Sequence, residues 1–322
     1  MKLKIIVSDS VDPYWNVAVE NYLVSLYATD VVTMYLWRNR RTVVIGRNQN
    51  PFSECDVNQL LADGGRLMRR TTGGGAVYHD DGNLNFSFIA PYDLYDQSRQ
   101  FEVIRRTIAT YGLECETSGR NDIMVTVDGQ PRKFSGNAFS KGRYQRLHHG
   151  TLLIKGNIDD LRRYLKVKPS KLQKHGVASV KSRVVNLSEL ADVTSDNIVA
   201  PLCAAFESVY DGTAEIMDFR KLVTEPEVER LHYLFSSDDW LYGNWRLFTA
   251  SKTASFEWGE VDLRLVVDEQ NGIIIDVDIA TDSLDVSLVE DTRHLLRGAS
   301  TSTPPHTDDP ELQDIVSLVY NT

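Results

Sequence analysis

The chain has 322 residues, of which 42% are hydrophobic and 25% are charged, and its formal net charge is −10. Such a chain can bury a large core and reaches the length at which proteins commonly divide into two domains. It lacks both an apolar run of about 18 residues and a secretory signal pattern, so we expect a cytoplasmic protein without a membrane span. Its three cysteines form no C-x-x-C pair, which argues against a disulfide framework and a zinc site.

The net charge is unevenly distributed along the chain. Residues 132–183 hold fourteen Lys or Arg and two acids, so this stretch is strongly basic while the remainder is acidic. A basic region on an acidic protein can attract an anionic substrate or an acidic protein surface. The alternative for the lysines at 166–174 is a solvated helix face. Nucleic acid binding is not expected, because aromatic residues are not interleaved with the basic ones.

The first predicted elements are a helix and two strands. Asp12 and Pro13 are typical of a helix start, and Val17 and Leu23 continue an apolar face that would pack on a sheet. Residues 33–37 and 42–45 are rich in strand-forming residues and flank a polar turn, which predicts a hairpin. A short helix at 56–62 follows.

The middle of the chain alternates runs of strands with helices. Strands are expected at 76–79, 83–89, 123–127, 133–139 and 145–154, with a turn at Lys141-Gly142, and helices at 97–111, 158–165, 195–210 and 225–235. Because strands come in runs, this order predicts an α+β domain and disfavours regular βαβ alternation.

A smaller unit is expected at the end of the chain. Residues 260–267 and 273–279 alternate on either side of Asn271-Gly272, a strong hairpin signal, and helical patterns follow at 288–296 and 311–319. We therefore expect a large domain at residues 1–245 and a small α+β accessory domain at residues 250–322.

The densest motif is R-R-T-T-G-G-G-A-V-Y-H-D-D-G-N at residues 69–83. Consecutive glycines allow positive φ and a close approach of the backbone to a ligand, and their N–H groups can converge on an anion. The run matches neither the P-loop nor the dinucleotide-binding pattern. A mobile loop or bulge is the alternative reading of such glycines.

Four further motifs follow the glycine run. G-R-N-D at 119–122 and R-K-F-S-G at 132–136 bring an acid and a lysine to neighbouring strands, where Asp122 could hold a magnesium–phosphate group and Lys133 could neutralise a carboxylate. The pair His148-His149 would face opposite sides of a strand, so it cannot chelate one metal. The basic segment 171–184 suits a loop over an anionic ligand.

Together these motifs, in this order and spacing, resemble the lipoate-protein ligase A family of the biotin/lipoate protein ligase superfamily. The resemblance also includes W-R-N at 37–39, V-V-I-G-R-N-Q-N-P at 43–51 and H-H-G-T-L-L at 148–153, and it covers most of the large domain. It implies a mixed sheet with helices and a C-terminal accessory domain. It also implies an ATP-dependent enzyme that converts free lipoate to lipoyl-AMP and then transfers the lipoyl group to a lysine of a carrier protein.

The resemblance assigns roles to particular residues. Lys133 is the expected catalytic residue and contacts both ATP and lipoate, while Asp122 is expected to bind ATP through magnesium. The further expected ATP-binding residues are Arg70, Gly75, Ala76, Val77 and Tyr78. The further expected lipoate-binding residues are Trp37, Gly73, Gly74 and His79. The implied partner is a lipoyl-carrier protein, either a lipoyl domain of a 2-oxoacid dehydrogenase or a glycine-cleavage H-type protein, and the enzyme is expected to be a monomer.

Several rival functions share this fold. An octanoyltransferase would need an activated cysteine near Lys133, and none lies between Lys133 and the H-H-G-T strand. A transferase that uses only preformed lipoyl-AMP, or a non-catalytic carrier-binding module, is compatible with the sequence. Biotin ligation is disfavoured, because the glycine- and arginine-rich loop of that family has no counterpart.

Overall fold

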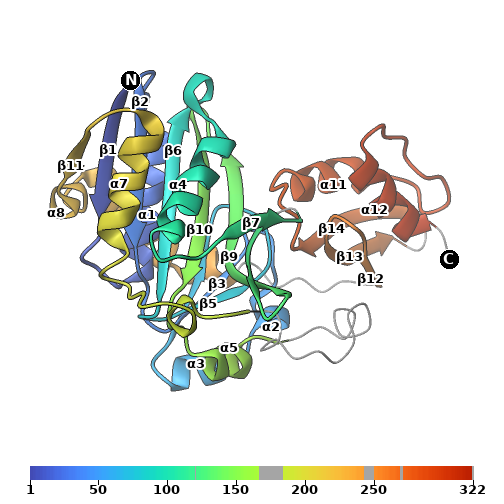
Figure 1. The fold of residues 1–322 in the computed structure, drawn as a ribbon. Coiled ribbons are helices and arrows are strands. Elements are labelled where there is room, and N and C mark those ends of the chain that lie inside the picture. The colour runs from blue at the N-terminus through green and yellow to red at the C-terminus, as the bar shows by residue number, and fades with distance from the viewer. Residues whose placement is uncertain (120, 167–183, 243–249, 269–270, 321–322) are drawn as a thin grey trace.

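The computed structural model describes every residue except 120, 167–183, 243–249, 269–270 and 321–322. Within these described ranges the chain forms a large mixed sheet covered by helices and a separate small sheet unit at the C-terminal end (Figure 1), which confirms the α+β class. Within the same ranges, no helix is both long and apolar enough to cross a membrane.

The large sheet has the strand order β11-β1-β2-β6-β10-β9-β8-β7. Its strands are β1 Lys2–Val7, β2 Val31–Trp37, β6 Asn83–Pro91, β7 Cys115–Ser118, β8 Asp122–Val127, β9 Gln130–Lys141, β10 Gln145–Leu153 and β11 Ala214–Met217. β1 pairs with β2 and β11 in parallel, and the pairs from β2 through β7 are antiparallel. The edge strand β11 was not predicted, because its four residues carry no clear alternation.

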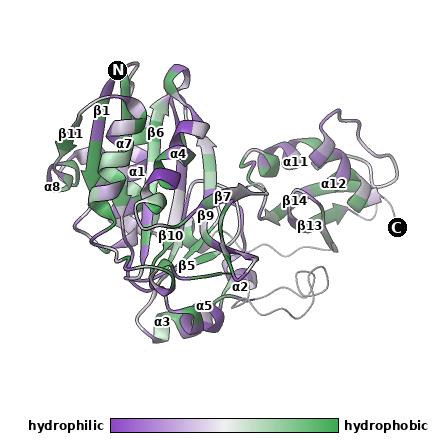
Figure 2. Ribbon diagram, in the orientation of Figure 1, coloured by the Kyte–Doolittle hydropathy of each residue, from purple (hydrophilic) through white to green (hydrophobic). Residues whose placement is uncertain are grey.

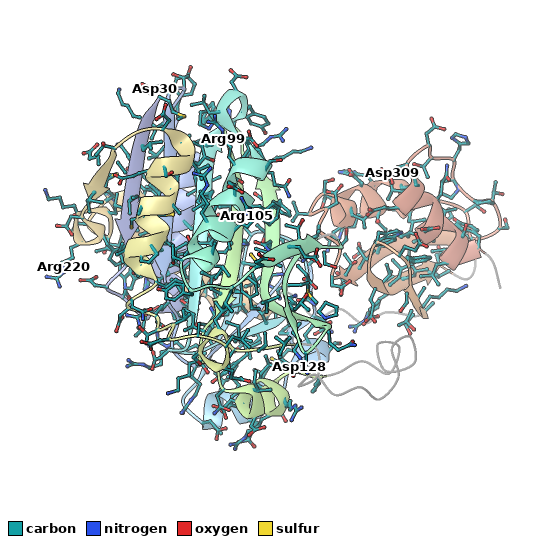
Figure 3. The ribbon with its side chains drawn as sticks, in the orientation of Figure 1. Asp30, Arg99, Arg105, Asp128, Arg220 and Asp309 are labelled. Carbon is teal, nitrogen blue, oxygen red and sulfur yellow. The ribbon has the colours of Figure 1, made fainter. Side chains whose placement is uncertain are left out.

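Helices cover both faces of this sheet. The helices are α1 Pro13–Ser25 and α9 Pro226–Ser236 on one face and α4 Gln97–Ala109 and α7 Val199–Tyr210 on the other. The predicted start of α1 is confirmed, since Asp12 caps the helix by accepting the N–H of Tyr14 and Pro13 is its first residue. Charged side chains such as Arg99 and Arg105 extend from α4 into solvent (Figure 3), and Arg105 pairs with Glu102 on the same helix.

A second sheet corrects the predicted hairpin at residues 33–45. Its strands are β4 Arg66–Arg69, β3 Thr42–Ile45 and β5 Val77–His79, in that order. β3 is parallel to β4 and antiparallel to β5. These two strands are its partners in the sheet, and β2 is not one of them. Both strands were therefore predicted correctly and their pairing was wrong. The polar segment between them carries the chain from one sheet to another, which a turn pattern alone cannot distinguish from a hairpin.

Short helices connect these sheets. They are α2 Pro51–Glu54, α3 Val57–Ala62, η1 Tyr92–Leu94, α5 Ile158–Tyr164, η3 Leu187–Glu189, α8 Phe219–Leu222 and α10 Asp238–Tyr242. The predicted basic segment 171–184 lies outside the described residues except for Val184, which forms a bridge with Lys133.

The C-terminal unit packs two helices on one face of a three-stranded sheet. Its elements are β12 Ala250–Ser255, β13 Glu260–Asp268, β14 Ile273–Thr281, α11 Leu288–Leu296 and α12 Pro310–Tyr320. The predicted β13–β14 hairpin is confirmed, but the paired strands end at Asp268 and Ile273, so its turn is longer than Asn271-Gly272 alone. Hydrophobic residues recur along β13 and β14 (Figure 2), and the buried ones pack with apolar residues of α11 and α12.

Candidate active site

A narrow slot of about 160 Å³ lies among α1, the large sheet and the second sheet. Its lining residues are Val17, Glu20, Trp37, Val44, Met68, Arg70, Gly74, Gly75, Ala76, Val77, His79, Asn85, Asn121, Lys133, Gly136, Asn137, Ala138, His149, Gly150 and Thr151. These residues come from seven strands of the two sheets, from the glycine run and from α1, so the slot forms only when both sheets are in place.

Lys133 and Asp122 meet beside the slot as the sequence predicted. Lys133 Nζ lies 2.6 Å from Asp122 Oδ1, and both side chains are about one-third exposed. They stand on the neighbouring strands β9 and β8, where a register irregularity follows Ile123. A Cβ on Gly136 would lie 3.0 Å from Lys133 Nζ, so glycine keeps this space open for the ammonium group. The result is a partly solvated cation within reach of an anionic ligand.

Arg70 organises the glycine run in this structure. Its guanidinium is buried and donates to the Thr72 hydroxyl and to the carbonyls of Gly73 and Gly75. Burial lowers the pKa of Arg70 to about 10, so the group stays protonated at neutral pH. These contacts point the loop carbonyls at Arg70. The guanidinium was predicted to contact ATP, and in this structure it binds the loop itself.

The structure places most of the other predicted site residues around the slot, with exceptions. Trp37, Gly74, Gly75, Ala76, Val77 and His79 line it. Tyr78 points away from it, because alternate residues of β5 face opposite sides, and its ring packs 5.4 Å from that of Tyr164. Gly73 is not among the lining residues and lies against Ser283 and Leu284 of the C-terminal unit. Arg120 lies outside the described residues.

A buried polar network that the sequence analysis missed forms one wall of the slot. Glu20 Oε1 accepts hydrogen bonds from the Ser87 hydroxyl at 2.5 Å and from His149 Nδ1 at 2.9 Å. His149 Nε2 lies 2.8 Å from the Thr72 hydroxyl, and Trp37 Nε1 donates to Ser87. The network thereby joins α1, three strands of the large sheet and the glycine run.

A signal for Glu20 was present in the sequence. Glu20 lies three residues after Val17 and three before Leu23, on the face of the helix that was predicted to be apolar. A charged residue at such a position is buried only with partners, so it marks a polar site within the core.

His148 and His149 face opposite sides of β10, as predicted. His148 is enclosed by the rings of Phe86, Phe101 and Phe139, and burial lowers its pKa to about 3. Its Nε2 lies 2.9 Å from Asn137 Oδ1, and its Nδ1 lies 2.9 Å from the Gln100 amide.

Asn137 links His148 to the turn before Asp122. Its side-chain amide and backbone N–H both donate to the carbonyl of Asn121, and Asn121 donates in return to the carbonyl of Asn137. His148 therefore supports, through Asn137, the position of the strand start that carries Asp122.

Arg69 connects the loop after β3 to α10. All its contacts are to carbonyl oxygens, including those of Arg47 and Gln49 on one side and those of Trp240 and Leu241 on the other. The guanidinium of Arg47 stacks 4.1 Å from the Trp240 ring on the same surface. Arg69 thus joins segments that are distant in sequence, and among the described residues its guanidinium binds only carbonyl oxygens.

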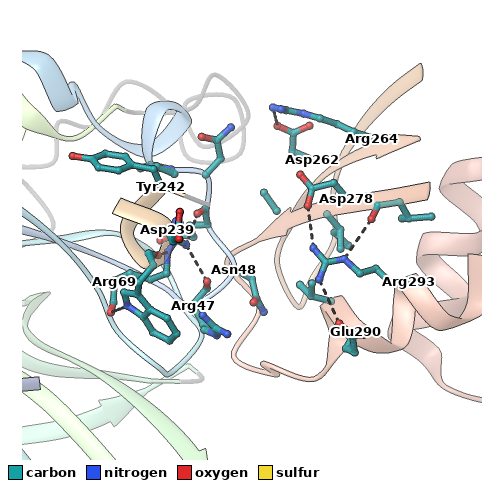
Figure 4. A pocket seen from close by; sticks show the side chains of 18 of the residues that line it. Arg47, Asn48, Arg69, Asp239, Tyr242, Asp262, Arg264, Asp278, Glu290 and Arg293 are labelled. Atoms are coloured by element: carbon teal, nitrogen blue, oxygen red, sulfur yellow. Dashed lines mark hydrogen bonds and ion pairs between the residues drawn. The ribbon is translucent and has the colours of Figure 1, made fainter. Parts of the chain in front are cut away.

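A larger cavity of about 610 Å³ lies between this surface and the C-terminal unit (Figure 4). On one wall Arg293 pairs with Asp278 at 3.1 Å and with Glu290 at 3.3 Å, and Arg264 pairs with Asp262 at 3.1 Å. Arg47 and Asn48 face it from the other wall. Its lining is thus rich in charges that are paired at the edge of solvent.

The C-terminal unit also contacts the glycine run directly. The N–H of Gly74 donates to the Ser283 carbonyl at 2.9 Å, and the N–H of Thr281 donates to the Asn48 carbonyl at 3.1 Å. A Cβ on Gly73 would lie 2.1 Å from the Ser283 oxygen, so only glycine permits this approach. One donor of the predicted anion-binding loop is therefore occupied by the C-terminal unit.

The cysteines lie away from the slot. None of Cys55, Cys115 and Cys203 is among its lining residues. Burial raises the pKa of the Cys115 thiol to about 11 and that of Cys55 to about 12, and it also raises the pKa of Cys203. At neutral pH all three stay protonated and are poor nucleophiles.

Comparisons with known proteins give matches over most of the chain. Residues 12–207 match the family described as lipoyl protein ligase A/B catalytic domain, and residues 247–304 match the bacterial lipoate protein ligase C-terminus. The chain is 39% identical to the lipoate-protein ligase A of Bdellovibrio bacteriovorus, over 92% of this chain and 88% of that protein. It is 37% identical to the lipoate-protein ligase A of Psychrobacter cryohalolentis, over 90% and 86% respectively.

Solved structures of lipoate ligases are also similar to this chain. P. falciparum LipL1 in complex with lipoate has a TM-score of 0.85 and 28% identity, over 99% of this chain and 100% of that one. A lipoate-protein ligase A bound with ATP has a TM-score of 0.61 and 25% identity, over 76% and 99%. A bipartite ligase from Thermoplasma acidophilum, described with its E2 lipoyl domain, has a TM-score of 0.66 and 25% identity, over 78% and 100%.

Proposed function

The chain belongs to the lipoyl protein ligase A/B family and is a ligase that attaches lipoate to protein, and we propose that it does so in two steps at the slot beside Lys133. In the first step a lipoate carboxylate oxygen attacks the α-phosphorus of ATP, which forms lipoyl-AMP and releases pyrophosphate. In the second step the amine of an acceptor lysine attacks the lipoyl carbonyl, which forms an amide, loses a proton and releases AMP.

The observation that carries this proposal is the position of Lys133 at the slot. Its ammonium group can neutralise the substrate carboxylate and then stabilise the negative charge that grows on the phosphoryl oxygens. The ion pair with Asp122 holds the Lys133 side chain at this edge of the sheet. Lys133 therefore serves both the binding of lipoate and its activation.

Asp122 fits a magnesium ion by the chemistry of its donor atoms. Mg²⁺ prefers oxygen ligands and is commonly held by one or two carboxylates together with substrate phosphates. Asp122 offers a carboxylate at the edge of the slot, and one of its oxygens binds Lys133. When bound, the ion would neutralise phosphate charge. The role of Lys133 in binding and positioning the lipoate carboxylate does not depend on it.

The glycine run is the proposed ATP contact. Residues Gly75, Ala76 and Val77 line the slot, and Arg70 binds the carbonyls of the loop that precedes them. The N–H of Gly74 donates to Ser283 in this conformation. An ATP phosphate could accept from Gly74 only after the C-terminal unit has shifted, so we propose that residues 250–322 form an accessory domain that acts with a catalytic domain at residues 1–245.

The acceptor is proposed to be a lipoyl-carrier protein, either a lipoyl domain of a 2-oxoacid dehydrogenase or a glycine-cleavage H-type protein. The described neighbour from Thermoplasma acidophilum was reported with an E2 lipoyl domain, which supports the first of these. We propose that the ligase acts as a monomer, because one chain brings Lys133, Asp122 and the glycine run together at the slot.

Pyrophosphate release tests the first step. Purified protein is given Mg-ATP with or without free lipoate and without any carrier. Lipoate-dependent release is expected. Its absence from folded protein that nevertheless transfers from synthetic lipoyl-AMP would indicate a transfer-only enzyme, and lipoate binding without either reaction would indicate a non-catalytic module.

The octanoyltransferase alternative is tested with Cys115→Ser. The thiol is protonated at neutral pH and lies outside the slot, so we expect the rate of lipoate attachment to change less than about twofold. A loss of two orders of magnitude, together with a thioester trapped on Cys115, would favour the cysteine mechanism.

A further inference from the structure

His79 presents a fixed hydrogen-bond donor to the slot. Asn16 accepts from the Tyr35 hydroxyl and donates to the carbonyl of Arg38 and to Asn39 Oδ1, which sets the orientation of both amides. Asn39 Nδ2 must then donate to His79 Nδ1, at 3.2 Å. A ring that accepts at Nδ1 carries its proton on Nε2. Burial lowers the pKa of His79 to about 3, so the ring stays neutral and keeps this tautomer.

This Nε2–H group has no hydrogen-bond partner among the described residues. His79 is 3% exposed and belongs to the slot lining. A buried donor without a partner costs about 1–3 kcal/mol. The surroundings of His79 in the slot include the apolar side chains of Trp37 and Met68. The missing acceptor is therefore expected on the ligand.

The sheet register places His79 at the end of the slot far from Lys133. Lys133 is on β9, whereas Trp37, whose ring lies 6.4 Å from that of His79, is on β2. Two strands, β10 and β6, stand between β9 and β2, so three strand spacings of about 4.8 Å separate the two ends. An acid whose carboxylate binds Lys133 would extend its tail toward His79 and Trp37.

We propose that His79 determines specificity by donating a hydrogen bond to a sulfur atom in the tail of the acid, so that the slot selects a dithiolane over a hydrocarbon tail. This inference rests on the proposed function, because Lys133 must hold the carboxylate end. Sulfur is a weak acceptor, and a saturated tail such as that of octanoate has none. A hydrocarbon tail leaves the Nε2–H group buried without a partner, whereas lipoate satisfies it.

The experiment compares lipoate with 5-cyclopentylpentanoate, which has a carbocyclic ring in place of the dithiolane and nearly the same shape. For each acid, kcat/KM is measured by pyrophosphate release with Mg-ATP. The wild-type protein is expected to prefer lipoate by about fivefold, the size of one modest hydrogen bond. Equal values for the two acids in the wild-type protein would overturn the inference without any variant.

Two substitutions at the same position separate the hydrogen bond from the shape of the ring. In His79→Asn the amide occupies the place of Nδ1, so it can still pair with Asn39 but has no group at the Nε2 position. In His79→Gln the amide reaches the Nε2 position. The preference for lipoate is expected to disappear in His79→Asn and to be retained in His79→Gln. His306→Asn, in an exposed loop, is the matched control. It is expected to keep the wild-type ratio of kcat/KM for the two acids.

The outcomes distinguish this inference from the proposed function. If neither acid stimulates pyrophosphate release in wild-type protein, the proposed function is wrong and the inference fails with it. If both acids do so and the ratio is the same in wild-type protein, His79→Asn and His79→Gln, the proposed function stands and only the role of His79 is wrong.

Discussion

The slot and the cavity beside the C-terminal unit use polar residues in opposite ways. The slot encloses about 160 Å³, and one of its walls is supported by a buried polar network that links Glu20, Ser87, His149 and Thr72. The larger cavity encloses about 610 Å³, and its charges, such as Arg293 and Asp278, are paired where water reaches them. Buried networks hold one geometry, whereas exposed pairs exchange partners at little cost.

The difference suggests a division of roles between the two regions. In the proposed function the slot recognises one small acid and positions its carboxylate, which requires fixed groups. The cavity separates two units that touch the same glycine run, so it must tolerate movement. Four substitutions test this contrast, from the largest expected effect to the smallest.

Lys133→Ala should have the largest effect, because it removes the charge that faces both the substrate carboxylate and the phosphoryl oxygens. Loss of one such group typically reduces the rate by about 10²–10³-fold. The measurement is the rate of lipoate-dependent pyrophosphate release. The midpoint temperature of thermal unfolding should stay close to that of the wild type. Lys141→Ala, at the exposed far end of the same strand, is the control. Normal turnover in Lys133→Ala would exclude the assigned role.

Gly73→Ala should separate the C-terminal unit from the glycine run. The new Cβ would lie 2.1 Å from the Ser283 carbonyl oxygen. Because the nearest atoms are backbone atoms of Ser283 and Leu284, no side-chain rotation can relieve the clash. Small-angle X-ray scattering should show a larger radius of gyration than in the wild type. Gly75→Ala is the matched control, since its Cβ would meet nothing within 4 Å. Equal radii in both variants would show that the contact does not hold the two units together.

His148→Met should reduce the acid sensitivity of folding. His148 is neutral in the folded state, with a pKa near 3, and binds a proton near pH 6.5 when unfolded. The unfolded state therefore binds more protons between these values, so stability is intact above pH 6.5 and is lost as pH falls toward 3. Each such histidine contributes a slope of about 1.4 kcal/mol per pH unit.

The free energy of unfolding, measured with urea between pH 6.5 and pH 4.5, should consequently fall less steeply in His148→Met than in the wild type. The absolute stability at neutral pH is expected to be lower, because Asn137 and Gln100 lose their shared partner. His306→Met is the control and should keep the wild-type slope. Parallel slopes in His148→Met and wild type would mean that His148 is protonated in the folded protein.

Arg293→Gln should have the smallest effect. Its guanidinium is 40% exposed and pairs with Asp278 and Glu290, and such pairs contribute at most about 1 kcal/mol. The free energy of unfolding should change by less than this, and the difference should shrink further in 0.5 M salt. A loss of several kcal/mol would show that the cavity is as rigid as the slot, which would remove the contrast between them.

The sequence alone predicted the α+β class, most of the elements, and an acid and a lysine on neighbouring strands, which the structure confirms for Asp122 and Lys133. Lys133, Asp122 and the glycine run were identified because their motifs combine unusual residues at fixed spacing. The pairing of β3 was wrong because a polar turn fits both a hairpin and a passage between sheets. Glu20 and His148 were missed as site residues because their partners come from other elements, and only packing brings them together.

The hydrogen-bond partners of Arg70 also could not be predicted from the sequence. An arginine before three glycines suggests an anion-binding group, yet a guanidinium can equally bind nearby carbonyls. Here the carbonyls of Gly73 and Gly75 accept hydrogen bonds from the guanidinium, because the loop folds back over the side chain. Local motifs identify which groups are present, and the tertiary structure decides which partners they have.

The contacts of Arg69 have a consequence for the order of folding. Its bond to the Leu241 carbonyl joins residues 172 positions apart, and its other bonds shape the loop at residues 46–49. Contacts of such long sequence separation form late, because closing the intervening chain costs entropy. During synthesis the large sheet can assemble before α10 leaves the ribosome, but this loop cannot take its final shape. The nascent protein would therefore complete the surface beside the glycine run among its last folding steps.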